Sequence, residues 1–181
     1  MPNYRRADYP GGTFFFTVVT FNRAPILTLD AVRVSLRNAI TTVRRERPFA
    51  IDAWVLLPDH LHCIWSLPEG DSDYSVRWSM IKRLVSKQQA GCAVRTESDG
   101  DSRRKRRELP FWQRRFWEHQ IRDETDYLRH VDYIHWNPVK HGYVTLAAEW
   151  PYSTFGRFVA RGCYPRDWGG GRDEKSSDFG E

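Results

Sequence analysis

The stretch LLPDHLHCIW, residues 56–65, decides the fold because it combines a tight turn with an apolar strand. Successive side chains of a strand point to opposite faces, so His60 and His62 share one face and the apolar residues beside them share the other. From these residues alone, a half-buried strand with a polar histidine face is as good an interpretation as a metal site, since two imidazoles supply only part of a ligand set.

The segments around this stretch predict a mixed fold. FAIDAWVLLP (49–58) is a second apolar strand, and Pro58-Asp59 gives the tight turn of an antiparallel hairpin with the histidine strand. Further strands are expected in residues 11–23 and 111–121, and helices in residues 30–46 (with Asp30 as N-cap), 75–90 and 123–137. This order predicts an α+β fold, in which helices sandwich a central, mainly antiparallel sheet.

Length and composition indicate one domain with a tail. We expect the domain to span residues 1–162, and the glycine-rich residues 163–181 to form a tail, regulatory or disordered, with three basic and five acidic side chains. Residues 95–108 contain almost no apolar side chain, which predicts an insertion between ordered elements.

The charge balance favours nucleic acid among the candidate partners. Lys and Arg number 28 against 23 Asp and Glu, a formal net charge of +5. No apolar run approaches the roughly 20 residues that a membrane helix needs, and the first 30 residues lack a signal-peptide core. Three widely spaced cysteines suggest no disulfide framework. We therefore expect a cytoplasmic protein that has no membrane partner.

A second histidine-rich stretch, HVDYIHWNPVKHG (130–142), has helical spacing. Tyr133 and Asn137 are four residues apart, so one helical face offers a phenol hydroxyl beside an amide oxygen. Pro138 disfavours helical geometry at Asn137, so we expect the helix to end or kink there. Taken alone, this segment is better explained as a tyrosine packed in an amphipathic helix with a capping asparagine than as a catalytic site.

Five stretches together carry a resemblance that covers residues 4–168. They are YRRADYPGGTFFFTV, AWVLLPDHLHCIW, FWQRRFWEHQIRDE, DYIHWNPVKHGYV and WPYSTFGRFVARGCYPRDW. A His–apolar–His strand followed by a helix with a tyrosine resembles the HUH superfamily of single-strand DNA nucleases. Within it, the chain resembles the REP-associated tyrosine transposases, which are related to the single-tyrosine transposases of bacterial insertion sequences.

The resemblance implies a ferredoxin-like HUH endonuclease fold and a role for each motif. His60 and His62 correspond to metal ligands, Tyr133 to the catalytic nucleophile, and Asn137 to the third ligand, where many relatives carry glutamine. It implies a metal-dependent endonuclease and strand transferase that cuts single-stranded DNA at hairpins of repeated extragenic palindromes through a covalent 5′-phosphotyrosine. Nitrogen ligands completed by oxygen suit Mn²⁺ or Mg²⁺.

Basic and aromatic side chains are expected to bind the DNA. Residues 103–122 hold eight basic and two acidic side chains, interleaved with Phe111, Trp112, Phe116 and Trp117, of which we expect at least half to pack in the core. The candidate DNA contacts are Arg5, Arg6, Arg114, Arg115 and Lys140. By resemblance, the DNA includes a short sequence flanking the hairpin, recognised partly by the N-terminal segment.

Several alternatives stay open at this point. His130, His135 and Lys140 lie near Tyr133 in sequence, and none is preferred as the group that helps remove its proton. The chain is alternatively a hairpin DNA- or RNA-binding protein that has lost catalysis, or a metal-dependent hydrolase that activates water. Insertion-sequence relatives act as dimers, whereas the repeat-associated branch is expected to be monomeric, and a dimer stays open.

Overall fold

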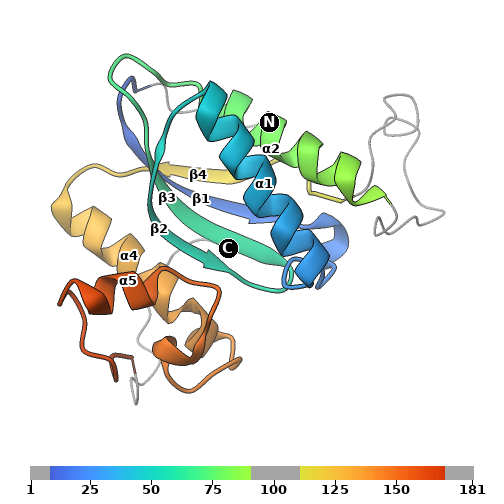
Figure 1. The fold of residues 1–181 in the computed structure, drawn as a ribbon. Helices are drawn as coiled ribbons and strands as arrows, with labels where there is room; N and C mark the ends of the chain where they lie inside the picture. Colours follow the sequence, from blue (N-terminus) through green and yellow to red (C-terminus); the bar gives the residue numbers. More distant parts are fainter. Residues whose placement is uncertain (1–8, 91–110, 170–181) are drawn as a thin grey trace, which may run out of the picture.

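A four-stranded antiparallel sheet lies at the centre of the computed structural model, which describes residues 9–90 and 111–169 (Figure 1). Its strands, in the spatial order β2-β3-β1-β4, are β1 (Thr13–Val19), β2 (Ala50–Leu56), β3 (His60–Ser66) and β4 (Trp117–Gln120). With α1 (Asp30–Glu46) after β1 and α2 (Tyr74–Gln88) after β3, the chain order β-α-β-β-α-β is that of a ferredoxin-like fold. The predicted α+β class is confirmed.

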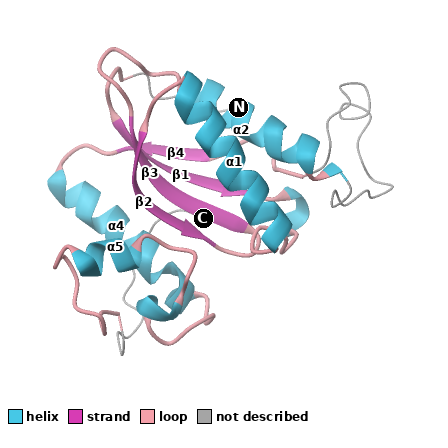
Figure 2. Cartoon of the chain, in the orientation of Figure 1, coloured by secondary structure: helices cyan, strands magenta, loops and turns pink. Residues whose placement is uncertain are grey.

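Helices cover both faces of this sheet. Figure 2 shows α1 and α2 together on one side, and α4 (Glu124–Lys140) with the short α5 (Phe155–Ala160) on the other. Two single turns of 3₁₀-helix, η1 (Phe21–Arg23) and η3 (Ala147–Glu149), lie in connecting segments. Within the described residues, no helix combines the length and the apolar character needed to cross a membrane.

The β2–β3 hairpin turns at Pro58 and Asp59, as the sequence predicts. The N–H of Leu57 donates to the carbonyl of His60 at 2.9 Å, which closes the two-residue turn. The carbonyl of Asp59 accepts bonds from the N–H (2.8 Å) and the hydroxyl (2.9 Å) of Thr20, at the end of β1. The turn is thereby held against β1, and this fixes the position at which β3 begins.

The face of the sheet under α1 and α2 is lined by apolar side chains, and we call it the apolar face. Trp65 is its centre: its ring stacks on Trp78 of α2 at 4.2 Å and lies 4.2 Å from Phe49. Alternate residues of β1 and β3 supply the rest of this lining, namely Phe14, Phe16, Val18, Leu61 and Cys63. All of these strand residues are fully buried, so this face is the main core.

The opposite face carries the histidines, and we call it the histidine face. It consists of Phe15 and Thr17 of β1, Ala53 and Val55 of β2, and His60, His62 and Ile64 of β3. Helix α4 packs across it, where its Val131 and Ile134 are fully buried. Because α4 covers this face, β3 is buried on both sides rather than half-buried.

Three expected boundaries differ from the structure. Helix α1 begins at Asp30 with Leu29 as N-cap, so the prediction of Asp30 as N-cap is wrong, and the Asp30 carboxylate instead pairs with Arg33 in the first turn. Helix α4 continues past Asn137 and Pro138 to Lys140. Pro138 removes one donor only, and the carbonyl of Asn137 still accepts from the His141 N–H at 3.0 Å.

The third difference concerns the strand expected over residues 111–121. Only Trp117–Gln120 form β4, and the preceding residues pair irregularly with the end of β1. The N–H of Phe21 donates to the carbonyl of Phe111, and the N–H of Gln113 donates to that of Val19, both at 2.9 Å. This detour allows Phe111 and Trp112 to be buried, which a regular edge strand would prevent for one of them.

The first residues of the expected tail pack against the domain. The Tyr164 hydroxyl donates to the Asp132 carboxylate of α4, and its ring lies 4.7 Å from that of Trp168. Burial and this hydrogen bond raise the pKa of Tyr164. The boundary at residue 163 stays a prediction, and residues 170–181 lie outside the described part of the chain.

Candidate metal and nucleophile site

His60 and His62 lie side by side on β3, as the alternation of strand side chains predicts. Their ring centroids are 4.9 Å apart at an interplanar angle of 80°, and they are only 3% and 1% exposed. The Nε2 atom of each ring is buried and has no hydrogen-bond partner. A buried polar atom without a partner costs free energy, so these two atoms require an explanation.

The other nitrogen of each ring is held by a neighbouring side chain. His60 Nδ1 lies 2.6 Å from an Asp59 carboxylate oxygen, and His62 Nδ1 lies 2.8 Å from the Thr17 hydroxyl. Burial alone would raise the pKa of Asp59, but hydrogen bonds from His60 and Arg23 outweigh it and lower that pKa. The ionised carboxylate only accepts, so His60 Nδ1 carries a proton and donates to Asp59.

His62 is held in the form that binds metals. Burial, followed by the positive charges that His60, His141 and Lys140 can carry, lowers the pKa of His62 well below its ordinary value. The ring is therefore neutral at physiological pH, which is the state that ligates a metal ion.

Helix α4 presents one polar face to this pair. Tyr133, Asn137 and His141 follow one another at intervals of four residues, so they share a side of the helix. The Tyr133 ring lies 5.1 Å from that of His62, and the His141 ring lies 5.3 Å from that of His60. Asn137 is therefore placed between these two contacts, opposite the histidine pair.

The amide of Asn137 completes the set of unpaired atoms. Asn137 is fully buried, and neither its Oδ1 nor its Nδ2 has a hydrogen-bond partner. Two imidazole nitrogens and one amide oxygen from opposed elements are a donor set that fits a divalent ion and leaves positions for other ligands. The structure thus places Tyr133 against His62, and Asn137 on the same side of α4 as Tyr133.

The three candidates for handling the tyrosine proton lie in different places. The ammonium of Lys140 lies 5.1 Å from the centroid of the Tyr133 ring. His135 faces away from the site: its Nε2 lies 3.0 Å from the Thr154 hydroxyl, and burial followed by the charge of Arg157 lowers its pKa to about 3. His130 is bonded to the backbone of its own helix. Lys140 is the candidate that the structure favours.

His130 belongs instead to a second cluster, with His119 and Asp126, at the junction of β4 and α4. The Asp126 carboxylate lies 2.8 Å from His119 Nε2 and accepts from the Arg122 N–H, while His130 Nδ1 donates to the Asp126 carbonyl at 2.8 Å. Burial would raise the pKa of Asp126, but the bonds from His119 and Arg122 lower it. The three ligand atoms lie within 4.8 Å of one another, close enough for one ion, although hydrogen bonds already join them.

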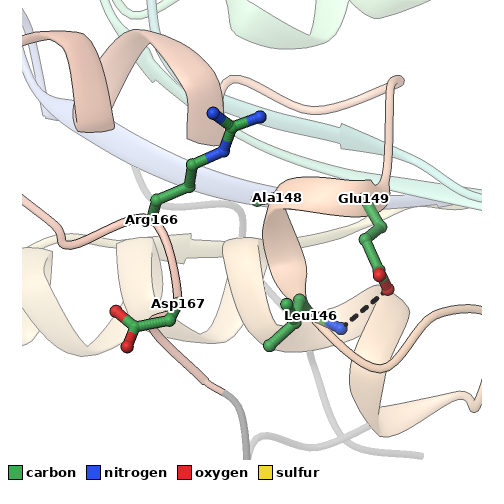
Figure 3. A pocket seen from close by; sticks show the side chains of 5 residues that line it. All are labelled: Leu146, Ala148, Glu149, Arg166 and Asp167. Atoms are coloured by element: carbon green, nitrogen blue, oxygen red, sulfur yellow. Dashed lines mark hydrogen bonds between the residues drawn. The ribbon is translucent and has the colours of Figure 1, made fainter.

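A shallow hollow of about 430 Å³ lies away from the polar face of α4. Leu146, Ala148, Glu149, Arg166 and Asp167 line it, and the Glu149 carboxylate accepts from the Leu146 N–H across it (Figure 3). None of the predicted site residues contributes to this hollow.

The candidate DNA contacts are only partly described. Arg114 and Arg115 are exposed on the segment before β4, whereas Arg5 and Arg6, like the basic insertion 95–108, lie outside the described residues. Among the aromatic side chains interleaved with this basic stretch, Phe111 and Trp112 are buried and Phe116 packs against the core, while Trp117 is 40% exposed. The expectation that at least half of them pack in the core is confirmed.

Sequence reasoning missed the supporting residues of the site. Thr17 reaches His62 only through the pairing of β1 with β3, and no local pattern reveals that register. His141 does have a signal, because it lies four residues after Asn137 on the same helical face. Asp59 is visible in sequence as a turn residue, but its bond to His60 is not.

Comparisons with known proteins give the fold and site their context. No family model matches the chain. An Escherichia coli (strain K12) protein named REP-associated tyrosine transposase is 49% identical over 170 residues, which are 94% of this chain and 92% of that protein. A Haemophilus influenzae relative, provisionally given the same name, is 42% identical over 175 residues, 97% of each chain.

A solved structure extends the similarity to three dimensions. It is the structure of the REP-associated tyrosine transposase bound to a REP hairpin, with a TM-score of 0.78 and 47% identity over 99% of this chain and 98% of that one. The fold and these relatives define the class of protein as a transposase. Within that class, the chain belongs to the family of REP-associated tyrosine transposases.

Proposed function

We propose that the chain is a metal-dependent, site-specific single-strand DNA endonuclease and strand transferase that acts on hairpins of repeated extragenic palindromes. One observation carries the proposal: two imidazole nitrogens of β3 and the amide of Asn137 on α4 are buried without a hydrogen-bond partner, and the His62 ring contacts the Tyr133 ring of the same helix. Unpaired buried polar atoms destabilise a fold, and a bound ligand that they share removes that cost. A relative's structure with a REP hairpin supports the choice of substrate.

His60, His62 and Asn137 would hold Mg²⁺ or Mn²⁺. The bonds of Asp59 and Thr17 orient the two imidazoles and direct their Nε2 atoms into the site. When bound, the ion acts as a Lewis acid on the scissile phosphate. The burial of all three side chains keeps water out of their immediate surroundings, where electrostatic attraction is strongest.

Tyr133 would be the nucleophile. Its hydroxyl oxygen attacks the phosphorus, a Tyr133–phosphate ester forms on the 5′ side, and the bond between phosphorus and the 3′ oxygen breaks. The phenolic proton leaves to solvent, and the departing 3′ oxygen takes up a proton. Attack by a 3′ hydroxyl on the phosphotyrosine reverses these steps, which gives strand transfer without an external energy source.

Lys140 would favour the reactive form of Tyr133. A phenol ordinarily loses its proton only near pH 10, so the enzyme needs a charge that stabilises the phenolate. The Lys140 ammonium, 5.1 Å from the ring centroid, would supply that charge. Arg114 and Arg115, with Arg5 and Arg6, would neutralise further phosphates along the DNA.

One copy of the chain would suffice. The histidine pair and the tyrosine helix that face each other belong to the same chain, so the site is complete without exchange of helices between subunits. We therefore propose a monomer as the active form.

The test uses a hairpin from the repeats that flank the gene, with unpaired flanks and a different label on its 5′ and its 3′ end, incubated with the full chain and Mn²⁺; the 5′ label reports the released fragment and the 3′ label reports the adduct. We expect a metal-dependent cleavage product together with a covalent protein–DNA adduct on a denaturing gel. Tight hairpin binding without either species would show a DNA-binding protein that has lost catalysis. Cleavage without an adduct would indicate hydrolysis by activated water.

A further inference from the structure

The end of α4 fixes an exposed tyrosine, Tyr143, beside the candidate site. The N–H of Tyr143 donates to the carbonyl of Pro138 at 3.0 Å, and that of Gly142 to Val139 at 2.9 Å. Gly142 has a φ of +70°, so this is a Schellman ending, which a residue with a side chain would strain. The backbone at Tyr143 is thus determined by hydrogen bonds and not by its own side chain.

The ring of Tyr143 belongs to a series of rings that reaches the histidine pair. It lies 5.3 Å from the Trp150 ring and 6.0 Å from the His141 ring, at interplanar angles of 26° and 30°. His141 in turn contacts His60 at 5.3 Å. Trp150 is anchored because its Nε1–H donates to the carbonyl of Leu56 at 3.0 Å. These two neighbouring rings therefore limit the movement of Tyr143.

Tyr143 is nevertheless open to solvent. It is 44% exposed, so much of its ring surface stays accessible beside these two aromatic neighbours. Two cations lie near this surface: Lys140 three residues earlier in the chain, and Arg23, which acts electrostatically on the Tyr143 hydroxyl and pairs with Asp59 at 3.1 Å. Burial and the Asp59 carboxylate raise the pKa of Tyr143, so its hydroxyl is neutral and the ring adds no negative charge against a phosphate.

We infer that Tyr143 is a stacking platform for an unpaired nucleobase next to the scissile phosphate. This inference rests on the proposed function, whose substrate it makes more specific. An unpaired base offers a flat π-face to an ordered, exposed ring, while its phosphates reach the cations beside it. Stacking of this kind recognises a base by its surface and places the adjoining phosphate over His60 and His62.

The experiment measures which unpaired base contributes to hairpin affinity through Tyr143. The full chain carries Tyr133→Phe to prevent cleavage, and binding of a labelled repeat hairpin is followed by fluorescence anisotropy in Mn²⁺. Each unpaired nucleotide flanking the hairpin is replaced in turn by an abasic site. We expect one abasic position to weaken binding about 5- to 150-fold, and we expect Tyr143→Leu to abolish that sensitivity at the same position.

Two variants serve as controls. Tyr143→Phe keeps the ring and should keep the sensitivity. Val34→Ala removes an exposed apolar side chain, 54% exposed and located on α1, which covers the opposite face of the sheet, and should leave the sensitivity of that position unchanged.

The outcomes separate this inference from the proposed function. The stacking platform is wrong if hairpins bind but Tyr143→Leu changes the effect of no abasic position. If the Tyr143→Leu chain, with Tyr133 intact, still cleaves the hairpins, the proposed nuclease activity stands. An equal loss of affinity for every oligonucleotide, abasic or not, would also overturn the stacking platform, since that pattern indicates a general structural effect. Absence of any hairpin binding overturns both.

Discussion

The two faces of strand β3 are equally buried, but one carries apolar side chains and the other carries two imidazoles. On the apolar face, Leu61, Cys63 and Trp65 pack against α1 and α2. Among these three side chains, one polar atom, the Trp65 Nε1, is buried without a hydrogen-bond partner. On the histidine face, His60 and His62 bury two imidazoles whose Nε2 atoms have no partner. A chain selected for stability alone would fill both faces with apolar side chains.

The two faces of β3 contribute to different properties of the protein. The apolar face holds the sheet to α1 and α2, and its side chains contribute through area and close packing. The histidine face carries an energetic penalty at the two unpaired imidazoles, and the proposed ion would remove that penalty. Substitutions on the two faces should therefore change different observables.

The largest expected effect belongs to Tyr133→Phe. The substitution removes one oxygen and almost no packing area, so we expect cleavage and adduct formation to fall by roughly 10³-fold or more. Hairpin affinity and the thermal midpoint should change little. The measurement is the initial rate of adduct formation in Mn²⁺, with binding followed on the same preparation.

Lys140→Gln is a matched control for this prediction, because it removes the charge beside the ring but keeps the nucleophile. Its rate should fall less than that of Tyr133→Phe, and part of the loss should be recovered at higher pH. Substantial adduct formation by the phenylalanine variant would contradict the assignment of Tyr133.

The second prediction contrasts Trp65→Ala with His62→Ala. Trp65 is fully buried and stacked, so its truncation should cost about 3–5 kcal/mol of unfolding free energy. His62→Ala loses one hydrogen bond to Thr17 and should cost closer to about 1 kcal/mol. Urea unfolding of both variants without metal measures this difference.

The change in thermal midpoint on addition of Mn²⁺ should distinguish the two faces further. Mn²⁺ should raise the thermal midpoint of the native chain and of a folded apolar-face variant such as Leu61→Val, but not that of His60→Ala or His62→Ala. Both histidine variants could instead lose much stability without metal and show no specific loss of the metal response. That result would show that His60 and His62 have a structural role.

The sequence predicts the two faces well because strand alternation is a local property. His60, Leu61 and His62 take their faces from the two-residue repeat, and the turn at Pro58 and Asp59 fixes where that repeat begins. Helical spacing likewise predicts that Tyr133 and Asn137 share a face of α4, and the Tyr133 ring lies beside the His62 ring.

Other features depend on contacts that no local pattern contains. The bond of Thr17 to His62 requires the register between β1 and β3. The continuation of α4 through Pro138 depends on burial and on the hydrogen bonds of the following turn, which outweigh the local preference of the residue before proline. The irregular pairing of residues 111–116 depends on the need to bury Phe111 and Trp112 together.

The third prediction tests the support of the histidine face. Asp59→Ala removes the acceptor that orients His60 and should weaken Mn²⁺ binding about 10- to 100-fold. Calorimetric titration of the full chain measures this. Arg23→Gln, which removes only the exposed partner of the same carboxylate, is the control and should change the affinity much less. Equal affinities for Asp59→Ala and the native chain would show that His60 is not oriented in this way.

The fourth prediction concerns the charged pair behind the apolar face. The guanidinium of Arg77 is 1% exposed and bonds the Asp71 carboxylate at 2.6 and 2.8 Å, and this bond lowers the pKa of Asp71 below its ordinary value of 3.8. A carboxyl whose pKa is lowered by folding stabilises the fold at higher pH, and this contribution disappears as the pH falls through the folded-state pKa.

Asp71→Asn should therefore reduce the unfolding free energy by about 2 kcal/mol at pH 7, less than for a fully buried pair because Asp71 is 29% exposed. The difference from the native chain should shrink as the pH falls below 3.8. Metal binding should be unaffected, because the pair lies on the side of the sheet away from the histidines. A constant difference down to pH 2 would mean that the carboxylate charge contributes nothing.

The smallest expected effect is that of Arg115→Gln, which belongs to neither face. Arg115 is exposed on the segment before β4 and would act through charge alone. A single phosphate contact contributes about one unit to the slope of log affinity against log salt, so we expect that slope to decrease by about 1 and the affinity to fall similarly for all hairpin sequences. Arg157→Gln, whose guanidinium donates to carbonyls of β2, is the exposed control that should leave the slope unchanged. If the Arg115 variant instead loses affinity for one sequence only, the side chain reads a base. Arg115 would then belong to recognition rather than to the general attraction between a basic chain and DNA.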